Sequence, residues 1–190
     1  EDVFLGHHRL SIIDTSNMSN QPMKIGDHII IFNGVIYNYL NLRDELISKG
    51  HTFKSSGDTE VLIKMYIEYG DSCVERLDGV FAFCIYDIVK NSIFLGRDRL
   101  GIKPLYYSIN EKQVIFSSSM IGLLCYKENK QVNPIALNYQ FTLHSVVPAP
   151  HTIISGINKL EPGCTMNILK SGKSYIKKYY DIESIQISEQ

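Results

Sequence analysis

The chain has 190 residues, a length that buries roughly 70% of the unfolded surface and favours one domain with its own core. Its 19 Lys and Arg residues against 20 Asp and Glu residues give a net charge of -1 without clusters of either sign, which excludes the charge pattern of a nucleic-acid-binding protein. The longest apolar run, residues 80–86, is too short to cross a membrane, and no basic segment precedes an apolar one at the N-terminus. We therefore expect a soluble, cytoplasmic protein that binds neither nucleic acid nor membrane.

The first third of the chain predicts two strands separated by a polar turn. Residues 3–14 read as an opening strand, and residues 14–22 are rich in turn-forming residues. A run of β-branched and aromatic residues from His28 predicts a buried strand that stops at Asn33-Gly34.

The Asn33-Gly34 pair is typical of a hairpin, but the residues that follow it have the apolar spacing of a helix. Residues 37–50 therefore predict a helix that ends at Gly50. A strand that runs directly into a helix presents the Asn33 amide and the Gly34 N–H side by side. These two donors suit a developing oxyanion.

A second helix is predicted to start near Asp58, whose carboxylate stands where it caps the first turn. Val61, Leu62 and Met65 form an apolar stripe, and Gly70 closes the helix. The stripe predicts that one face of this helix packs against the strands.

The second half of the chain is dominated by short strands. Four strand-like segments predict an antiparallel meander: residues 79–87, 92–98, 104–110 and 114–119. Two shorter helices are expected near residues 119–126 and 134–143, and residues 164–180 read as a hairpin. Runs of strands interrupted by two packed helices predict an α+β sandwich with largely antiparallel sheets.

The four cysteines are scattered, at Cys73, Cys84, Cys125 and Cys164. No C-x-x-C pair occurs, and no His stands at the spacing of a zinc ligand, so we expect neither a disulfide framework nor a metal site. Cys84 alternates with apolar residues in a strand-like segment, which favours a buried thiol over a reactive thiolate.

Several segments together resemble the glutaminase domain of class II glutamine amidotransferases. In chain order they are HHRLSIID, NQPM, FNGVIYNY, SSGDTEVL, LDGVFAFCIYD and GRDRLGIKPLYY. The later segment VVPAPHTIISGINKLEPGCTMNI is similar to the one that closes this domain in glutamine-hydrolysing asparagine synthetases. The resemblance covers nearly all of residues 1–190 and implies an N-terminal nucleophile hydrolase-type αββα sandwich of two mainly antiparallel sheets.

The resemblance also implies roles for residues along the chain. Arg9 is expected to bind the α-carboxylate of L-glutamine, and Asp58 its α-ammonium. The Asn33 side-chain amide and the Gly34 N–H are expected to form the oxyanion hole. The backbone of four consecutive residues is expected to line the same pocket: Leu10, Ser11, Ile12 and Ile13.

The chain departs from the family at specific positions. The family has Glu where this chain has Val35, which removes a second carboxylate for the substrate ammonium, and Ser119 stands where the synthetases carry an acidic residue. The chain begins with Glu1 rather than with the nucleophilic cysteine of the family. We therefore expect a partial domain, with the nucleophile segment and an ATP-dependent synthetase domain outside residues 1–190.

The function implied by the resemblance is glutamine hydrolysis that supplies ammonia for the ATP-dependent amidation of aspartate. ATP and Mg²⁺ would act in the synthetase domain, with no cofactor or metal in this one, and a homodimer is one expected assembly. The isolated 190-residue chain is expected to be inactive because it lacks the nucleophile. Two alternatives remain: a non-catalytic glutamine-binding or scaffold domain, and an amidotransferase with another acceptor, such as a sugar.

Overall fold

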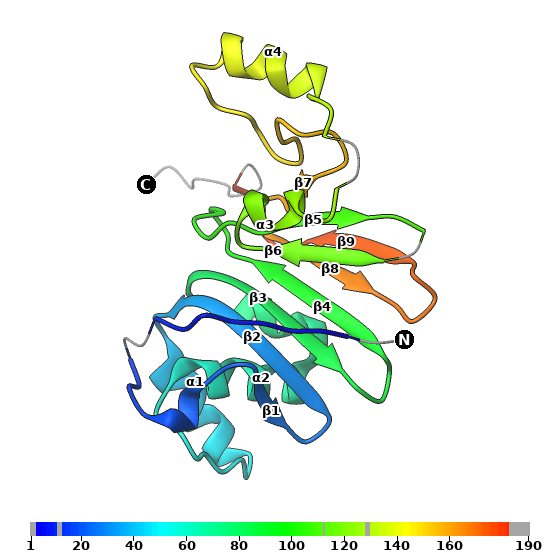
Figure 1. Ribbon diagram of the computed structural model, residues 1–190. Helices are drawn as coiled ribbons and strands as arrows, with labels where there is room; N and C mark the ends of the chain where they lie inside the picture. Colours follow the sequence, from blue (N-terminus) through cyan, green and yellow to red (C-terminus); the bar gives the residue numbers. More distant parts are fainter. Residues whose placement is uncertain (1–2, 11–12, 112, 128–129, 183–190) are drawn as a thin grey trace, which may run out of the picture.

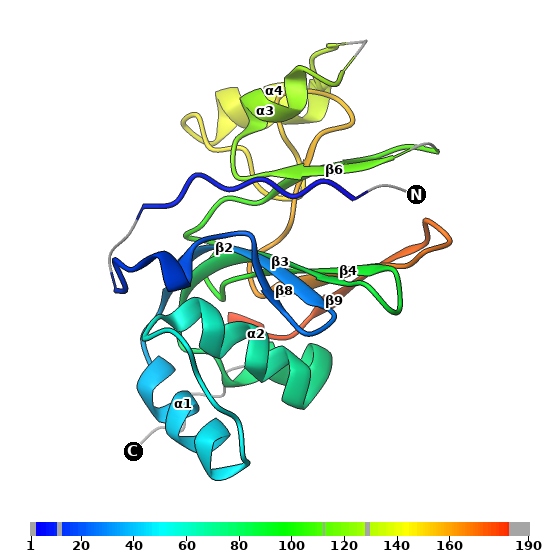
Figure 2. The same ribbon diagram turned by 60° about the horizontal axis from the view of Figure 1, so that its bottom comes forward.

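The chain folds into two antiparallel sheets that face each other, with helices on the outer side of each sheet (Figures 1 and 2). The computed structural model describes residues 3–10, 13–111, 113–127 and 130–182. The layer order of helix, sheet, sheet and helix confirms the predicted α+β sandwich. No helix within these ranges is long and apolar enough to cross a membrane.

The larger sheet has six strands in the order β1-β2-β3-β4-β8-β9. Their bounds are β1 (Met23–Ile25), β2 (His28–Ile36), β3 (Gly79–Asp87), β4 (Ser92–Arg97), β8 (Cys164–Ile168) and β9 (Ser174–Lys178). The longest pairing joins β2 and β3, in register from His28↔Asp87 to Ile36↔Gly79. The antiparallel pairing of β8 with β9 confirms the predicted hairpin at the end of the chain.

The smaller sheet has three strands in the order β6-β5-β7. Their bounds are β5 (Tyr106–Ile109), β6 (Val114–Ser117) and β7 (Asn158–Lys159). The predicted meander was therefore wrong as a single unit: all four of its strands form, but β3 and β4 belong to the larger sheet and β5 and β6 to the smaller one.

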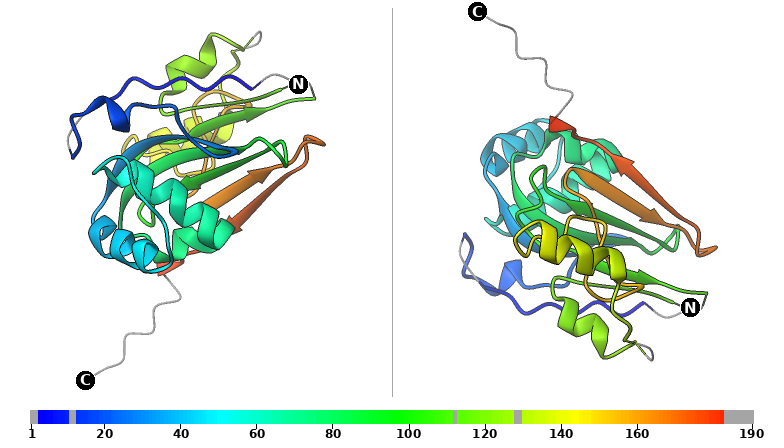
Figure 3. Two further views of the ribbon diagram at one scale, coloured as in Figure 1. Left: turned by 90° about the horizontal axis from the view of Figure 1, so that it is seen from below. Right: turned by 90° about the horizontal axis from the view of Figure 1, so that it is seen from above.

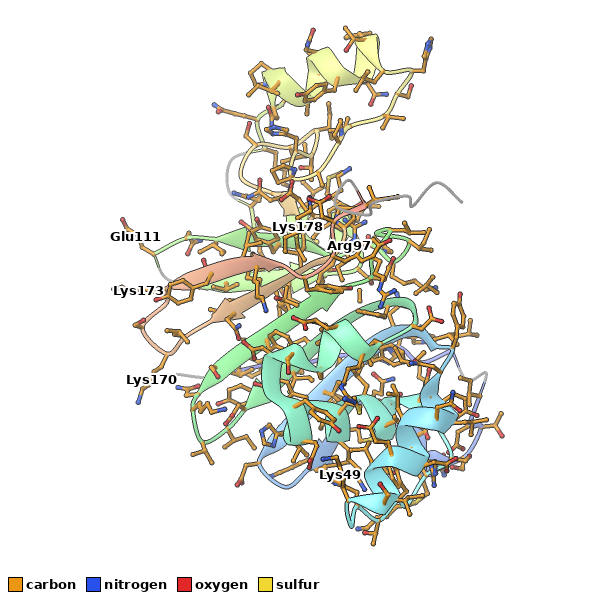
Figure 4. All side chains as sticks on the ribbon, turned by 180° about the vertical axis from the view of Figure 1, so that it is seen from behind. Lys49, Arg97, Glu111, Lys170, Lys173 and Lys178 are labelled. Carbon is orange, nitrogen blue, oxygen red and sulfur yellow. The ribbon has the colours of Figure 1, made fainter. Side chains whose placement is uncertain are left out.

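Arg97 and Asp98 hold the segment that carries the chain from the larger sheet to the smaller one. The Asp98 carboxylate accepts hydrogen bonds from the backbone N–H groups of Ile102 and Lys103, each at 2.9 Å. The Arg97 guanidinium donates to the carbonyl oxygens of Gly101 at 2.7 Å and Lys103 at 2.8 Å. Figure 4 shows Arg97 among the strands rather than at the periphery of the molecule. These contacts give hydrogen-bond partners to the backbone of the crossing segment, which ladder hydrogen bonds do not reach.

The described residues contain four α-helices, with bounds α1 (Tyr39–Ser48), α2 (Asp58–Tyr69), α3 (Met120–Leu124) and α4 (Pro134–Thr142). Two 3-10 helices accompany them, η1 (Asn17–Ser19) and η2 (Gly70–Arg76). All four predicted helical segments are thus confirmed. Helices α1 and α2 lie over the outer face of the larger sheet (Figure 3, left), and α4 belongs to an arm that stands away from both sheets (Figure 1).

Two apolar clusters form the core. The first lies between the larger sheet and helices α1 and α2, and it includes Leu46, Leu62 and Phe81, none of which is exposed. The second lies between the two sheets and includes Leu95 and Leu160, which are also fully buried. The larger sheet therefore has an apolar residue set on each face.

The opening segment was predicted to be a strand, and this prediction was wrong for the residues described, 3–10. The backbone is extended and alternate residues are less exposed, but no strand ladder forms there. Leu5 packs against the cluster between the sheets, and the segment runs between the two sheets (Figure 2). Alternating burial needs only an extended chain, whereas a strand also needs a neighbouring backbone that pairs with it.

Strand β2 does not stop at Asn33-Gly34 as predicted; it continues to Ile36. Its pairing with β3 includes Asn33↔Ala82 and Gly34↔Phe81. Tertiary pairing with β3 therefore overrides the turn preference of Asn-Gly, while the predicted passage from this strand into a helix is confirmed by α1.

Candidate active site

A cavity of about 380 Å³ opens between the two sheets beside β2. Arg9, Asn33, Gly34 and Asp58 all line it, although they belong to different segments of the chain. Leu10, Ile13 and Val35 also contribute to its wall, whereas Ser11 and Ile12 lie outside the described residues. Ser119 is at the N-cap of α3 and is not part of the wall.

The side chains of β2 divide between the cavity and the helix-side core. Phe32 and Ile36 belong to the core cluster under α1 and α2. Asn33 and Val35 lie at the alternate positions and line the cavity. Because successive strand side chains point to opposite faces, the residue two positions after Asn33 faces the same space.

The free edge of β2 explains why a backbone donor is available beside Asn33. Strand β1 pairs with β2 only as far as Ile30. The Tyr37 N–H donates to the Asp78 carbonyl at 2.7 Å, so odd-numbered residues of β2 bond toward β3 and even-numbered residues point to the opposite edge. This alternation turns the Gly34 N–H toward the open edge.

The two even-numbered neighbours of Gly34 have side-chain acceptors on that edge. The Phe32 N–H donates to Gln21 Oε1 at 2.6 Å, and the Ile36 N–H donates to Asp58 Oδ2 at 3.0 Å. The Gly34 N–H thus lies between two satisfied donors, and Gly34 and Asn33 both line the cavity. This is the donor pair that the resemblance predicted for an oxyanion hole.

Glycine is required at position 34 by the close approach of β3. A Cβ atom on Gly34 would lie 2.1 Å from the Val80 carbonyl oxygen and 2.7 Å from Phe81 Cα, with φ at +155°. Backbone atoms at these distances do not yield without separating the strands. The residue type is therefore set by packing as well as by the proposed chemistry.

Asp58 is the first residue of α2, after Gly57 at the N-cap, and is 6% exposed. Burial raises the pKa of its carboxyl above the usual value, while the Ile36 N–H, the N–H groups of the first helical turn and the Arg9 charge oppose the rise. A buried carboxylate with a raised pKa gains from a cationic partner, which fits the predicted contact with a substrate ammonium.

The Arg9 guanidinium is anchored on the loop that precedes β1. It donates to the carbonyl oxygens of Asp14 and Ser16, the latter at 3.0 Å, and to Asn20 Oδ1 at 3.3 Å. A guanidinium has five N–H donors, and these bonds account for three of them. Arg9 is therefore held in place with donor capacity left for a carboxylate.

Asp14 organises the same loop, a role that the sequence did not reveal. Its carboxylate accepts from the Ser16 N–H at 2.8 Å, the Ser19 hydroxyl at 2.8 Å and the Ser56 N–H at 2.9 Å. Hydrogen bonds from Ser16 and then Ser19 are the main reason that the pKa of Asp14 lies well below its usual range. The bond to Ser56 ties the loop carrying the Arg9 acceptors to the segment before α2.

One cysteine lies in the wall of the cavity. Burial raises the pKa of the Cys84 thiol far above its usual value, which favours the neutral form that the sequence predicted. No group of three or more His, Cys, Asp and Glu side chains comes together to hold a metal ion in the part of the chain that the structure describes.

Comparison with known proteins identifies close sequence relatives. A family profile described as glutamine amidotransferase domain matches residues 1–180. Glutamine-hydrolyzing asparagine synthetase 1 of Bacillus subtilis (strain 168) is 40% identical over 182 residues, covering 95% of this chain and 28% of the relative. Glutamine-hydrolyzing asparagine synthetase 3 of the same organism is 36% identical over 187 residues, covering 96% and 30%. The chain thus spans less than a third of the length of these two relatives.

A solved structure shares the fold. The glutamine phosphoribosylpyrophosphate amidotransferase of Bacillus subtilis, complexed with ADP and GMP, matches with a TM-score of 0.64 at 18% identity, over 92% of this chain and 34% of that one. This match confirms the predicted N-terminal nucleophile hydrolase-type sandwich. Together with the sequence relatives, it leads to one conclusion: the chain belongs to the family of glutamine amidotransferase domains.

Proposed function

We propose that residues 1–190 form the glutamine-hydrolysing domain of an asparagine-synthetase-type enzyme. The observation that carries this proposal is the convergence of Arg9, Asn33 and Asp58 on one cavity. A cationic fork and a carboxylate suit the two charged groups of an amino acid, and amide donors suit its side-chain carbonyl. The sequence identity of 40% to a glutamine-hydrolyzing asparagine synthetase, over 95% of the chain, supports the same function.

In this proposal Arg9 binds the α-carboxylate of glutamine and Asp58 binds its α-ammonium. A thiolate attacks the side-chain carbonyl carbon, and the carbonyl oxygen becomes an oxyanion that accepts hydrogen bonds from Asn33 and the Gly34 N–H. The base that took the thiol proton returns it to the amide nitrogen, so the intermediate expels ammonia and leaves a thioester, which water hydrolyses to glutamate and the free thiol. The residues of this domain therefore bind, orient and stabilise, while the thiolate forms and breaks the covalent bonds.

The thiolate is not assigned to any of the four cysteines of this chain. Cys73, Cys84 and Cys164 are buried, and burial raises the pKa of each. Cys125 is exposed at the end of α3, outside the cavity wall. We propose that the full-length natural protein supplies the thiol from outside residues 1–190.

The ammonia would then reach a β-aspartyl adenylate, made from aspartate and ATP with magnesium in a further domain. The relatives support this part of the proposal, because the two synthetases are more than three times as long as the region they share with this chain. Transfer to aspartate makes the overall product asparagine.

The test is steady-state kinetics on the full-length natural protein with glutamine, aspartate and ATP. We expect ammonia release from glutamine and the formation of asparagine with AMP. Asn33→Ala should lower kcat by about 100- to 1000-fold because it removes one oxyanion donor. Thermal stabilisation by glutamine without ammonia release would indicate the scaffold alternative, and ammonia release without asparagine would indicate another acceptor.

A further inference from the structure

Gln21 joins two parts of the cavity that lie on different elements. Its Oε1 accepts from the Phe32 N–H at 2.6 Å, and its Nε2 donates to Thr59 Oγ1 at 3.4 Å. Phe32 directly precedes Asn33 in β2, and Thr59 directly follows Asp58 in α2. One side-chain amide therefore contacts the neighbours of both proposed substrate-binding groups.

The contact with Phe32 replaces a strand pairing that is missing. Pairing between β1 and β2 reaches only Met23↔Ile30, so the Phe32 N–H falls beyond the last ladder position on that edge. Phe32 is 4% exposed, and a buried N–H without an acceptor is strongly unfavourable. The Gln21 Oε1 atom accepts the hydrogen bond that a strand partner would otherwise accept, and it holds the backbone of β2 in position just before Gly34.

The contact with Thr59 sets where α2 begins relative to the strand. Thr59 is 4% exposed, and the Asp58 carboxylate beside it accepts the Ile36 N–H at 3.0 Å. The strand edge is thus bound to the helix start on both sides of Gly34, by Gln21 on one side and by Asp58 on the other. A bound glutamine must span the distance between the oxyanion donors on β2 and the Asp58 carboxylate on α2.

We propose that Gln21 is a positioning residue for glutamine hydrolysis, which sets the spacing between the oxyanion donors on β2 and Asp58 on α2. This inference rests on the proposed function. The carbonyl and the ammonium of one glutamine are joined by a short chain of single bonds that limits how far apart they can lie, so both ends are met only if strand and helix keep their relative position. Errors of about 1 Å in such alignment lower rates by roughly 100-fold.

The experiment compares variants of the full-length natural protein in glutaminase kinetics. Gln21→Met has a similar shape and removes both contacts, Gln21→Glu keeps an oxygen for the Phe32 N–H, and Thr59→Val removes only the helix partner. Asn38→Leu is the matched control, since the Asn38 amide also bridges two backbone groups, the Arg76 carbonyl and the Asp78 N–H, each at 3.0 Å, outside the cavity wall.

We expect Gln21→Met to lower kcat by roughly 100-fold with a smaller change in KM, and Thr59→Val to lower kcat by about 10-fold. Gln21→Glu should recover most of the lost kcat, and Asn38→Leu should stay within about twofold of the natural protein. Circular dichroism verifies that each variant is folded. The proposal is overturned if folded Gln21→Met loses no more kcat than Asn38→Leu.

Backbone amide exchange separates this proposal from the proposed function. Exchange at the Phe32 and Gly34 N–H groups should be faster in Gln21→Met than in the natural protein, because the strand edge loses its acceptor. Unchanged exchange at both groups would overturn the positioning role even if activity fell. If the natural protein releases no ammonia, the proposed function fails, and the exchange experiment still decides whether Gln21 holds the strand.

Discussion

At Asp58, burial and ionisation oppose each other. The carboxyl is 6% exposed, and burial raises its pKa above the value in an unfolded chain. Because the folded state holds the proton more tightly, the ionised group lowers stability above the folded-state pKa, and this loss disappears below the unfolded-state pKa. Such a group is retained where its charge serves a ligand, as proposed here for the substrate ammonium.

Asp58→Asn should therefore raise the thermal unfolding midpoint at pH 7, and the difference should shrink as the pH falls toward about 4, the usual pKa of an unfolded Asp. The Asn oxygen can still accept the Ile36 N–H. The same change should raise KM for glutamine roughly 10- to 100-fold, because a charge-assisted hydrogen bond is worth about 1.5–3 kcal/mol. Thermal unfolding at the two pH values and glutaminase kinetics measure both effects, with the exposed Asp44→Asn as control. A lower midpoint at pH 7 with unchanged KM would contradict this account.

Val35 offers the opposite change at the same cavity. It lines the wall two positions after Asn33, at the position where the resemblance implies a glutamate. Val35→Glu should lower KM several-fold. The gain in binding free energy should be smaller than the about 1.5–3 kcal/mol of a charge-assisted hydrogen bond, because the new carboxylate loses some hydration. Steady-state kinetics with the uncharged Val35→Gln as control tests this. An unchanged KM in a folded Val35→Glu variant would mean that this side chain does not face the ammonium.

At the scale of elements, the two edges of β2 have different roles: one pairs with β3, and the other presents backbone donors to the cavity. The edge toward β3 is fully paired, which fixes the register, and the edge away from β3 loses its partner beyond Ile30. On that open edge, Gln21 accepts a hydrogen bond from the Phe32 N–H and Asp58 accepts one from the Ile36 N–H. The Gly34 N–H lies between these two donors. The length of β1, only three residues, therefore leaves space for the proposed site.

Gly34→Ala should destabilise this pairing by about 3 kcal/mol, because the new Cβ would overlap the backbone of β3. Urea unfolding of the variant, followed by circular dichroism, gives the free energy of unfolding. Gly6→Ala is the matched control, since a Cβ there meets nothing within 4 Å, and its effect should stay within about 0.5 kcal/mol. Equal stability of the two variants would show that β2 and β3 separate at little cost.

At the scale of the whole molecule, the two apolar clusters hold the sandwich, whereas the arm containing α4 adds little to it. Phe94 is 1% exposed and its ring lies 5.2 Å from Tyr66 and 5.6 Å from Phe83, measured between centroids. Phe141 on α4 is 80% exposed. The same residue type thus stands in two very different environments.

Phe94→Ala should cost about 3–5 kcal/mol in the free energy of unfolding, because it opens a cavity in the helix-side core. Phe141→Ala should stay within about 0.5 kcal/mol, since little apolar surface changes its exposure. Denaturant titration of both variants measures the contrast. A loss above about 2 kcal/mol for Phe141→Ala would mean that the arm packs against the rest of the protein in solution.

The elements could be predicted well, and their pairing less well. Helices α1 and α2 were predicted because apolar spacing and terminal glycines act locally. The stop at Asn33-Gly34 was wrong because pairing with β3 outweighed a local turn preference, and the single meander was wrong because Arg97 and Asp98 carry the chain into a second sheet. Local propensity contains neither of these long-range contacts.

Sequence alone determined the α+β class, the helical segments and, through the resemblance, the residues expected at the glutamine site. Only the tertiary structure decided that Arg9, Asn33 and Asp58 share one cavity, and that Asp14 and Gln21 hold the segments around it. The physical reason is that a side chain bonded to a distant backbone group has no periodic or local signal in the chain. Such contacts exist only after folding has brought a free strand edge, a loop and a helix start together.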